Sequence, residues 1–191
     1  MKQVLLLGDS IRMFYQDRVR ELLGEDYNVS APGENCRFAA YTLNSLRMWL
    51  PEFPKPDIIH WNNGLWDTAV IYAEDGCFTP LDEYVRTLER ILRRLRQTGA
   101  EIIFATTTPT HPGKEAWTTE MPPKHANADI RRYNEAAVEL MRREGVRVND
   151  LYARVCDDIE NYVCEDWIHP SENGIETLAQ AVAASIKEAA K

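Results

Sequence analysis

The chain has 191 residues, of which 45% are hydrophobic and 27% charged, a balance typical of a globular domain and not of a disordered or membrane-embedded chain. The formal net charge of -8 at pH 7 argues against a surface that neutralises nucleic-acid phosphates. We therefore expect a single domain over residues 1–191, with no nucleic-acid or membrane partner. The oligomeric state stays open.

The chain opens with an apolar run, Val4 to Leu7, followed at once by Gly8-Asp9-Ser10. Such a run predicts a buried parallel strand, and the turn after it leads into a helix that ends at Gly24. Ser10 then lies at the carboxyl edge of the sheet, where open α/β folds bind their ligands. It is a candidate nucleophile, and a serine in this position is also typical of a helix N-cap.

Strands and helices alternate along the middle of the chain. Residues 27–30 predict a short edge strand, and Pro32-Gly33-Glu34-Asn35 predicts a turn before an amphipathic helix from Ala39 to Leu50. Prolines interrupt the chain before residues 57–61, a β-branched run typical of a central strand. This strand leads into Asn62-Asn63-Gly64-Leu65-Trp66-Asp67, a second polar loop at the edge that holds Ser10.

The most regular helical pattern follows. Thr79 and Pro80 predict the start of a helix that ends at Gly99. Residues 102–106 predict a fourth strand, and the long loop over residues 107–123 is of a kind that often covers a binding site. A further helix over residues 130–141 and an edge strand over 146–148 complete a doubly wound α/β/α sandwich with a parallel sheet.

An aspartate and a histidine three residues apart, Asp166 and His169, precede the last predicted helix, which Ser171 caps. With Ser10 they form the parts of a nucleophilic triad. In that interpretation Ser10 attacks an acyl carbon, and His169 takes its proton and returns it to the leaving group. Asp166 orients the imidazole.

The Gly-Asp-Ser block at Ser10 and the Asp-x-x-His block at His169 together resemble the SGNH (GDSL-type) hydrolase family. The resemblance implies a three-layer sandwich whose five-stranded sheet has the flavodoxin-like order 2-1-3-4-5. It also implies a serine esterase that hydrolyses oxygen esters through an acyl-enzyme. No metal-ligand spacing or glycine-rich phosphate motif is present, and we expect neither a cofactor nor a metal.

The resemblance also names donors for the oxyanion hole. The backbone N–H of Ser10 is the first, and that of Gly33 the second, although Pro32-Gly33 is equally typical of a simple turn. The family's third block is Gly-x-Asn-Asp, whereas here Trp66 takes the place of the asparagine. We expect Asn63 to supply the missing amide, with Asn62 or Asn35 as alternatives and an ordinary turn as the other interpretation.

Residues expected to contact substrate gather in the same loops: Asp9, Asn35, Asn62, Trp66, Trp117 and Trp167. Tryptophan faces beside a polar site suit sugar rings, and core packing is the alternative for each. By family analogy we expect a small-molecule or carbohydrate ester, with an acetyl group on a carbohydrate as the preferred substrate. His111 and His125, near the long loop, stay open between solvent and substrate.

Two other functions stay open. An O-acyltransferase would use the same triad with another acceptor, and an inactive carbohydrate-binding relative would explain the altered third block. We interpret the four cysteines as reduced thiols, and pairing of Cys156 with Cys164 stays open. The opening apolar run is too short for a signal peptide, so we expect a cytoplasmic protein unless a leader has been removed.

Overall fold

The computed structural model describes residues 1–53, 55–115 and 124–191. Its centre is a five-stranded parallel sheet in the order β2-β1-β3-β4-β5, which confirms the predicted topology. The strands are β1 (Lys2–Leu7), β2 (Tyr27–Ser30), β3 (Ile58–Trp61), β4 (Glu101–Ala105) and β5 (Arg147–Asn149).

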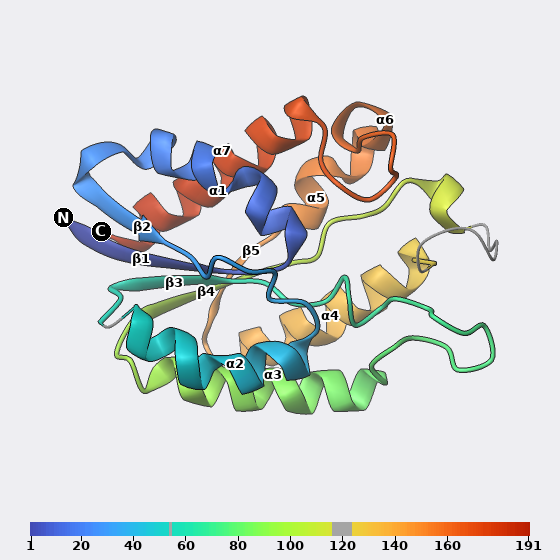
Figure 1. Ribbon diagram of the computed structural model, residues 1–191, viewed down its shortest axis with the longest axis horizontal. Helices are drawn as coiled ribbons and strands as arrows, with labels where there is room; N and C mark the ends of the chain where they lie inside the picture. The colour runs from blue at the N-terminus through green and yellow to red at the C-terminus, as the bar shows by residue number, and fades with distance from the viewer. Residues whose placement is uncertain (54, 116–123) are drawn as a thin grey trace.

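Helices cover both faces of the sheet (Figure 1). On one face lie α1 (Ser10–Leu23), α5 (Leu151–Val155), α6 (Ile159–Tyr162) and α7 (Glu172–Ala189). On the other lie α2 (Ala39–Glu52), α3 (Leu81–Arg96) and α4 (Asn127–Arg143). Single 3-10 turns occupy Gly24–Asp26, Pro112–Glu115 and Cys156–Asp158.

The alternation of side chains along β1 divides the core between these layers. Val4 and Leu6 pack in the cluster beneath α1 and α7, whereas Leu5 and Leu7 pack in the cluster beneath α2 and α3. All four are buried, as expected for a strand covered on both faces. The continuous apolar run at the start of the chain is thus explained by burial from both sides.

The loops that follow β1, β2 and β3 are tied together at the carboxyl edge of the sheet. The N–H of Cys36 donates to Gly8 O at 3.1 Å, and the N–H of Asn62 donates to Leu7 O at 2.9 Å. These bonds hold the segments after β2 and β3 against the start of α1. The fold therefore assembles its polar loops around Ser10.

Two local predictions are wrong. Thr79 does not cap α3, whose N-cap is Pro80, because the Thr79 side chain hydrogen-bonds Asp67 instead. The helix predicted from Ala39 to Leu50 does not end before Pro51, since α2 continues through this proline to Glu52. The short helices α5 and α6 were not predicted. No helix within the described residues is long and apolar enough to cross a membrane.

Candidate active site

The first turn of α1 holds the candidate nucleophile. Asp9, not Ser10, is the N-cap, and its Oδ1 accepts the N–H of Ile11 at 3.0 Å. Ser10 is the first residue of the helix, so its hydroxyl is not used to cap the backbone. The interpretation of Ser10 as a cap is therefore wrong, and the side chain is available for chemistry.

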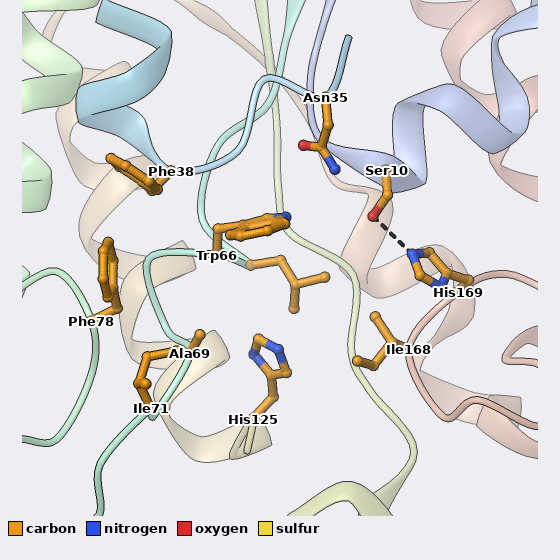
Figure 2. A pocket seen from close by; sticks show the side chains of 11 residues that line it. Ser10, Asn35, Phe38, Trp66, Ala69, Ile71, Phe78, His125, Ile168 and His169 are labelled. Carbon is orange, nitrogen blue, oxygen red and sulfur yellow. Dashed lines mark hydrogen bonds between the residues drawn. The ribbon is translucent and has the colours of Figure 1, made fainter. Parts of the chain in front are cut away.

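The hydroxyl of Ser10 meets the imidazole of His169, which lies 159 positions away in the sequence. Ser10 Oγ and His169 Nε2 are 2.8 Å apart, as the dashed line in Figure 2 marks. The other ring nitrogen, His169 Nδ1, lies 2.5 Å from Asp166 Oδ2. The structure thus brings the three predicted triad residues into one chain of hydrogen bonds.

Asp166 is held by the turn that it begins. Trp167 adopts a left-handed φ of 68°, and the N–H groups of Ile168 and His169 both donate to Asp166 Oδ1 at 2.9 Å. The thiol of Cys164 adds a third donor to the same oxygen at 3.1 Å. Partial burial raises the pKa of Asp166, but the bonds from the His169 side chain and these backbone groups outweigh it and hold the pKa well below its usual range.

The imidazole is fixed from a second side by an aromatic ring. Phe14, one turn along α1 from Ser10, stacks on His169 with ring centroids 4.8 Å apart and an interplanar angle of 27°. Beyond His169, Ser171 caps α7, since its Oγ accepts the N–H of Gly174 at 3.1 Å. The predicted cap is confirmed, and His169 lies between a helix start and an aromatic face.

A cavity of about 420 Å³ opens beside Ser10 and His169. Figure 2 shows that most of the side chains around it are apolar and that the imidazole of His125 faces into it. The walls come from segments far apart in the chain: Asn35, Phe38, Leu65, Trp66, Ala69, Ile71, Phe78, His125 and Ile168. Two residues of the predicted substrate set, Asn35 and Trp66, are among them.

Asn63 does not face this cavity. Its side chain is buried, and its Nδ2 donates to Arg37 O at 3.0 Å and to Thr42 Oγ1 at 2.9 Å. Its Oδ1 accepts the indole N–H of Trp61 at 2.7 Å. Because both amide hydrogens are bound, the expectation that Asn63 completes the oxyanion hole is wrong.

Asn62 and Asp9 also lie outside the large cavity. The amide of Asn62 donates to Ala105 O at 2.9 Å and so ties β3 to β4. Both side chains instead line a small cavity of about 10 Å³ behind α1, together with Tyr15. Burial raises the pKa of Asp9 to about 6, although the hydrogen bond from Ile11 and the positive charge of Arg12 both lower it. Neither residue is placed to contact substrate.

The remaining residues of the predicted site do not line the large cavity or are not described by the structure. Gly33 is exposed and does not line the cavity, and Trp167 stacks on the ring of His111 at 6.0 Å. Trp117 lies outside the described residues. The aromatic walls Phe38 and Phe78 were missed, since apolar residues in loops carry no periodic signal. His60 is buried within β3 and does not line the cavity.

A serine hydroxyl bonded to a histidine, which is bonded in turn to a carboxylate, defines the active-site class of the serine hydrolases. Their order along this chain, serine first and histidine last, differs from that of the chymotrypsin and subtilisin types. The chain belongs to the GDSL-like lipase/acylhydrolase family, whose sequence model matches residues 6–176. It is thus a member of an ester hydrolase family.

Solved structures share the fold over nearly the whole chain. The lipase/acylhydrolase from Enterococcus faecalis superposes with a TM-score of 0.80 at 20% identity, over 98% of this chain and 96% of that chain. A GDSL-like lipase from Bacteroides thetaiotaomicron gives 0.76 at 15% identity, over 98% and 89%. The acetyl xylan esterase AlAXEase gives 0.67 at 17% identity, over 96% and 99%. A search of curated proteins finds no match.

Proposed function

We propose that this chain hydrolyses oxygen esters through an acyl-enzyme formed on Ser10. The observation that carries the proposal is the unbroken chain of hydrogen bonds from Ser10 Oγ through His169 to Asp166. Nδ1 of His169 is held as a donor by the carboxylate, so Nε2 is left as the acceptor that a general base requires.

In the first half-reaction, Ser10 Oγ forms a bond to the ester carbon while its proton moves to His169 Nε2. The carbonyl π pair moves onto oxygen and forms a tetrahedral oxyanion. When that pair returns, the bond from carbon to the alcohol oxygen breaks, and the departing alcohol takes the proton from His169. Water then repeats the sequence: it gives a proton to His169, attacks the acyl carbon and releases the acid, and Ser10 recovers the proton.

The cavity favours an ester with an apolar organic group. An engineered apolar cavity of about 150 Å³ binds benzene, and the space beside Ser10 is about 420 Å³. It exceeds what an acetyl group would fill, and its walls include Phe38, Ile71 and Phe78. Burial of an apolar group there would contribute about 0.8 kcal/mol per methylene.

An acetyl ester of a carbohydrate is the second candidate. Trp66 is 40% exposed and lines the cavity, so its ring is accessible for stacking against a sugar. Trp167 gives no support, because it stacks on His111 away from the cavity. Hydrolysis of acetylated xylan faster than of any apolar ester would favour this candidate over the first.

The reaction is tested by hydrolysis of 4-nitrophenyl butyrate. Ser10→Ala and His169→Ala should each lower kcat/KM by about 10⁴-fold or more. Ser30→Ala and His111→Ala are matched controls outside the site and should retain the rate. Sugar binding without turnover would instead indicate an inactive carbohydrate-binding relative. Preferential formation of a new ester from an added alcohol in water would indicate an O-acyltransferase.

The substrate class is tested with 4-nitrophenyl esters of increasing acyl length and with acetates of increasing alcohol length. In at least one series kcat/KM should rise by about fourfold per methylene until the cavity is filled. If kcat/KM stays constant in both series, or falls from the first member onward, the substrate does not carry an apolar group in this cavity. The esterase mechanism would be unaffected by that result.

A further inference from the structure

A tetrahedral oxyanion needs donors besides the backbone N–H of Ser10, and the expected amide of Asn63 is fully bound elsewhere. Two side chains that line the cavity with Ser10 carry an N–H group on the side that faces Ser10: the amide of Asn35 and the indole of Trp66. Each comes from a loop that the fold fixes tightly.

The amide of Asn35 has a defined orientation. Its Oδ1 accepts the N–H of Arg37 at 2.8 Å, so its NH₂ group must face the opposite way. Figure 2 shows the nitrogen directed toward Ser10 and the oxygen directed away. Among the described residues none accepts a hydrogen bond from this nitrogen.

The loop that carries Asn35 is held in place by hydrogen bonds from a buried arginine. Arg12 is 1% exposed, and its guanidinium donates to Pro32 O at 3.1 Å and to Glu34 O at 2.6 Å. The N–H of Cys36 then reaches back to Gly8 O at 3.1 Å. Asn35 lies between these anchors, so it is held at a fixed place relative to the start of α1.

Trp66 is held by the residues on either side of it. Leu65 is buried, and the carboxylate of Asp67 accepts the N–H of Ala39 through both oxygens at 3.1 Å. Figure 2 shows the indole lying across the cavity with its nitrogen at the end nearest Ser10. No acceptor for this N–H is found in the part of the chain that the structure describes.

We propose that the indole N–H of Trp66 and the amide of Asn35 complete the oxyanion hole with the backbone N–H of Ser10. This proposal rests on the proposed esterase function and makes both side chains catalytic residues. The developing negative charge would meet three donors at the mouth of an apolar cavity, where each bond is stronger than in water. In the third block, the indole N–H of Trp66 would then replace the asparagine amide that the family pattern has at this position.

The sharpest test removes one N–H at a time. Replacing the Trp66 indole by benzothiophene, through incorporation of benzothienylalanine, keeps the ring size and deletes only the donor. Trp66→Phe provides a second variant. Asn35→Asp keeps the Oδ1 acceptor for Arg37 and removes the donor. Each should lower kcat for 4-nitrophenyl butyrate by about 10²–10³-fold with KM changed by less than about threefold.

Two matched variants distinguish the loss of a hydrogen-bond donor from a change in the shape of the cavity. Phe78→Leu alters the cavity without deleting an N–H, so it should act mainly on KM. Tyr72→Phe removes a hydroxyl from the same loop outside the cavity lining and should change neither constant. A larger effect of Phe78→Leu than of the benzothiophene replacement on kcat would overturn the assignment of Trp66.

A second measurement does not depend on turnover. Phenylboronic acid forms a tetrahedral adduct with a serine hydroxyl, and one adduct oxygen imitates the oxyanion. Its affinity should fall in the donor variants in parallel with kcat. Unchanged affinity and kcat in these variants, with activity abolished in Ser10→Ala, would overturn this proposal and leave the esterase intact. A wild type without turnover, whose boronate affinity still falls in the donor variants, would overturn the esterase alone.

Discussion

Asp9 makes the stability of the fold depend on pH, and Asp9→Asn isolates that dependence. The carboxyl is 1% exposed, and its Oδ2 has no hydrogen-bond partner among the described residues. Burial raises its pKa from 3.8 to about 6, although the bond from Ile11 and the positive charge of Arg12 act in the opposite direction. Between about pH 4 and pH 6, the folded protein thus retains a proton that the unfolded chain releases.

The sign and size of this effect on the free energy of unfolding follow from the linkage between proton binding and folding. Because the folded pKa is the higher one, the contribution of Asp9 to stability is fully present below about pH 4 and is lost as pH rises through about 6. The difference between 3.8 and about 6 is about 2 in pKa, and at about 1.4 kcal/mol per unit this corresponds to about 3 kcal/mol. Asparagine caps a helix as well as aspartate does and does not ionise.

Urea unfolding of wild type and Asp9→Asn should therefore give similar free energies at about pH 4. At about pH 8 the variant should be more stable by about 3 kcal/mol. Asp17→Asn is the matched control for the loss of a carboxylate from the same helix, because Asp17 is exposed and pairs with Arg20 at the surface. A constant difference between Asp9→Asn and wild type over this range would refute the reasoning that the buried carboxyl titrates in the folded state.

Two further variants test how the loops are held. Arg12→Met should lower the free energy of unfolding by about 3–5 kcal/mol, because buried backbone carbonyls lose their donor. Arg20→Met, on the more exposed side of the same helix, should cost much less in the same urea titration, and equal losses would contradict the clamp. Gly64→Ala should lower the free energy of unfolding by about 2 kcal/mol or more, since φ is 152° and a Cβ would lie 2.2 Å from Thr107 Oγ1. A melting curve by circular dichroism that is unchanged from wild type would contradict this expectation.

Much of the fold was predictable because its elements have strong apolar patterns. The four consecutive apolar residues of β1 and the helical spacing in α3 reflect burial that extends over whole elements. The helices α5 and α6 are too short to show a period, and they are stabilised by packing on α7, a contact distant in sequence. Thr79 was misassigned because its partner, Asp67, is likewise distant.

The triad and the cavity differ in what the sequence reveals of them. Ser10, Asp166 and His169 are polar residues in two short, distinctive blocks, and the order and spacing of these blocks predict a meeting that the structure confirms. The cavity walls are single residues from several loops, and only the folded chain brings Phe38 and Phe78 within 5.0 Å of each other, centroid to centroid. Short motifs therefore predict the chemistry here much better than the substrate.

The Gly-Asp-Ser block itself shows why a motif has to be judged by its neighbours. A Cβ on Gly8 would lie 2.8 Å from Arg12 Cβ, so glycine allows α1 to start close against β1. Asp9 then takes the capping bond that Ser10 would otherwise compete for. Ser10 Oγ is free to approach His169 only because the preceding carboxylate satisfies the helix N-terminus. The availability of the nucleophile is thus a property of all three residues, and the serine alone would not predict it.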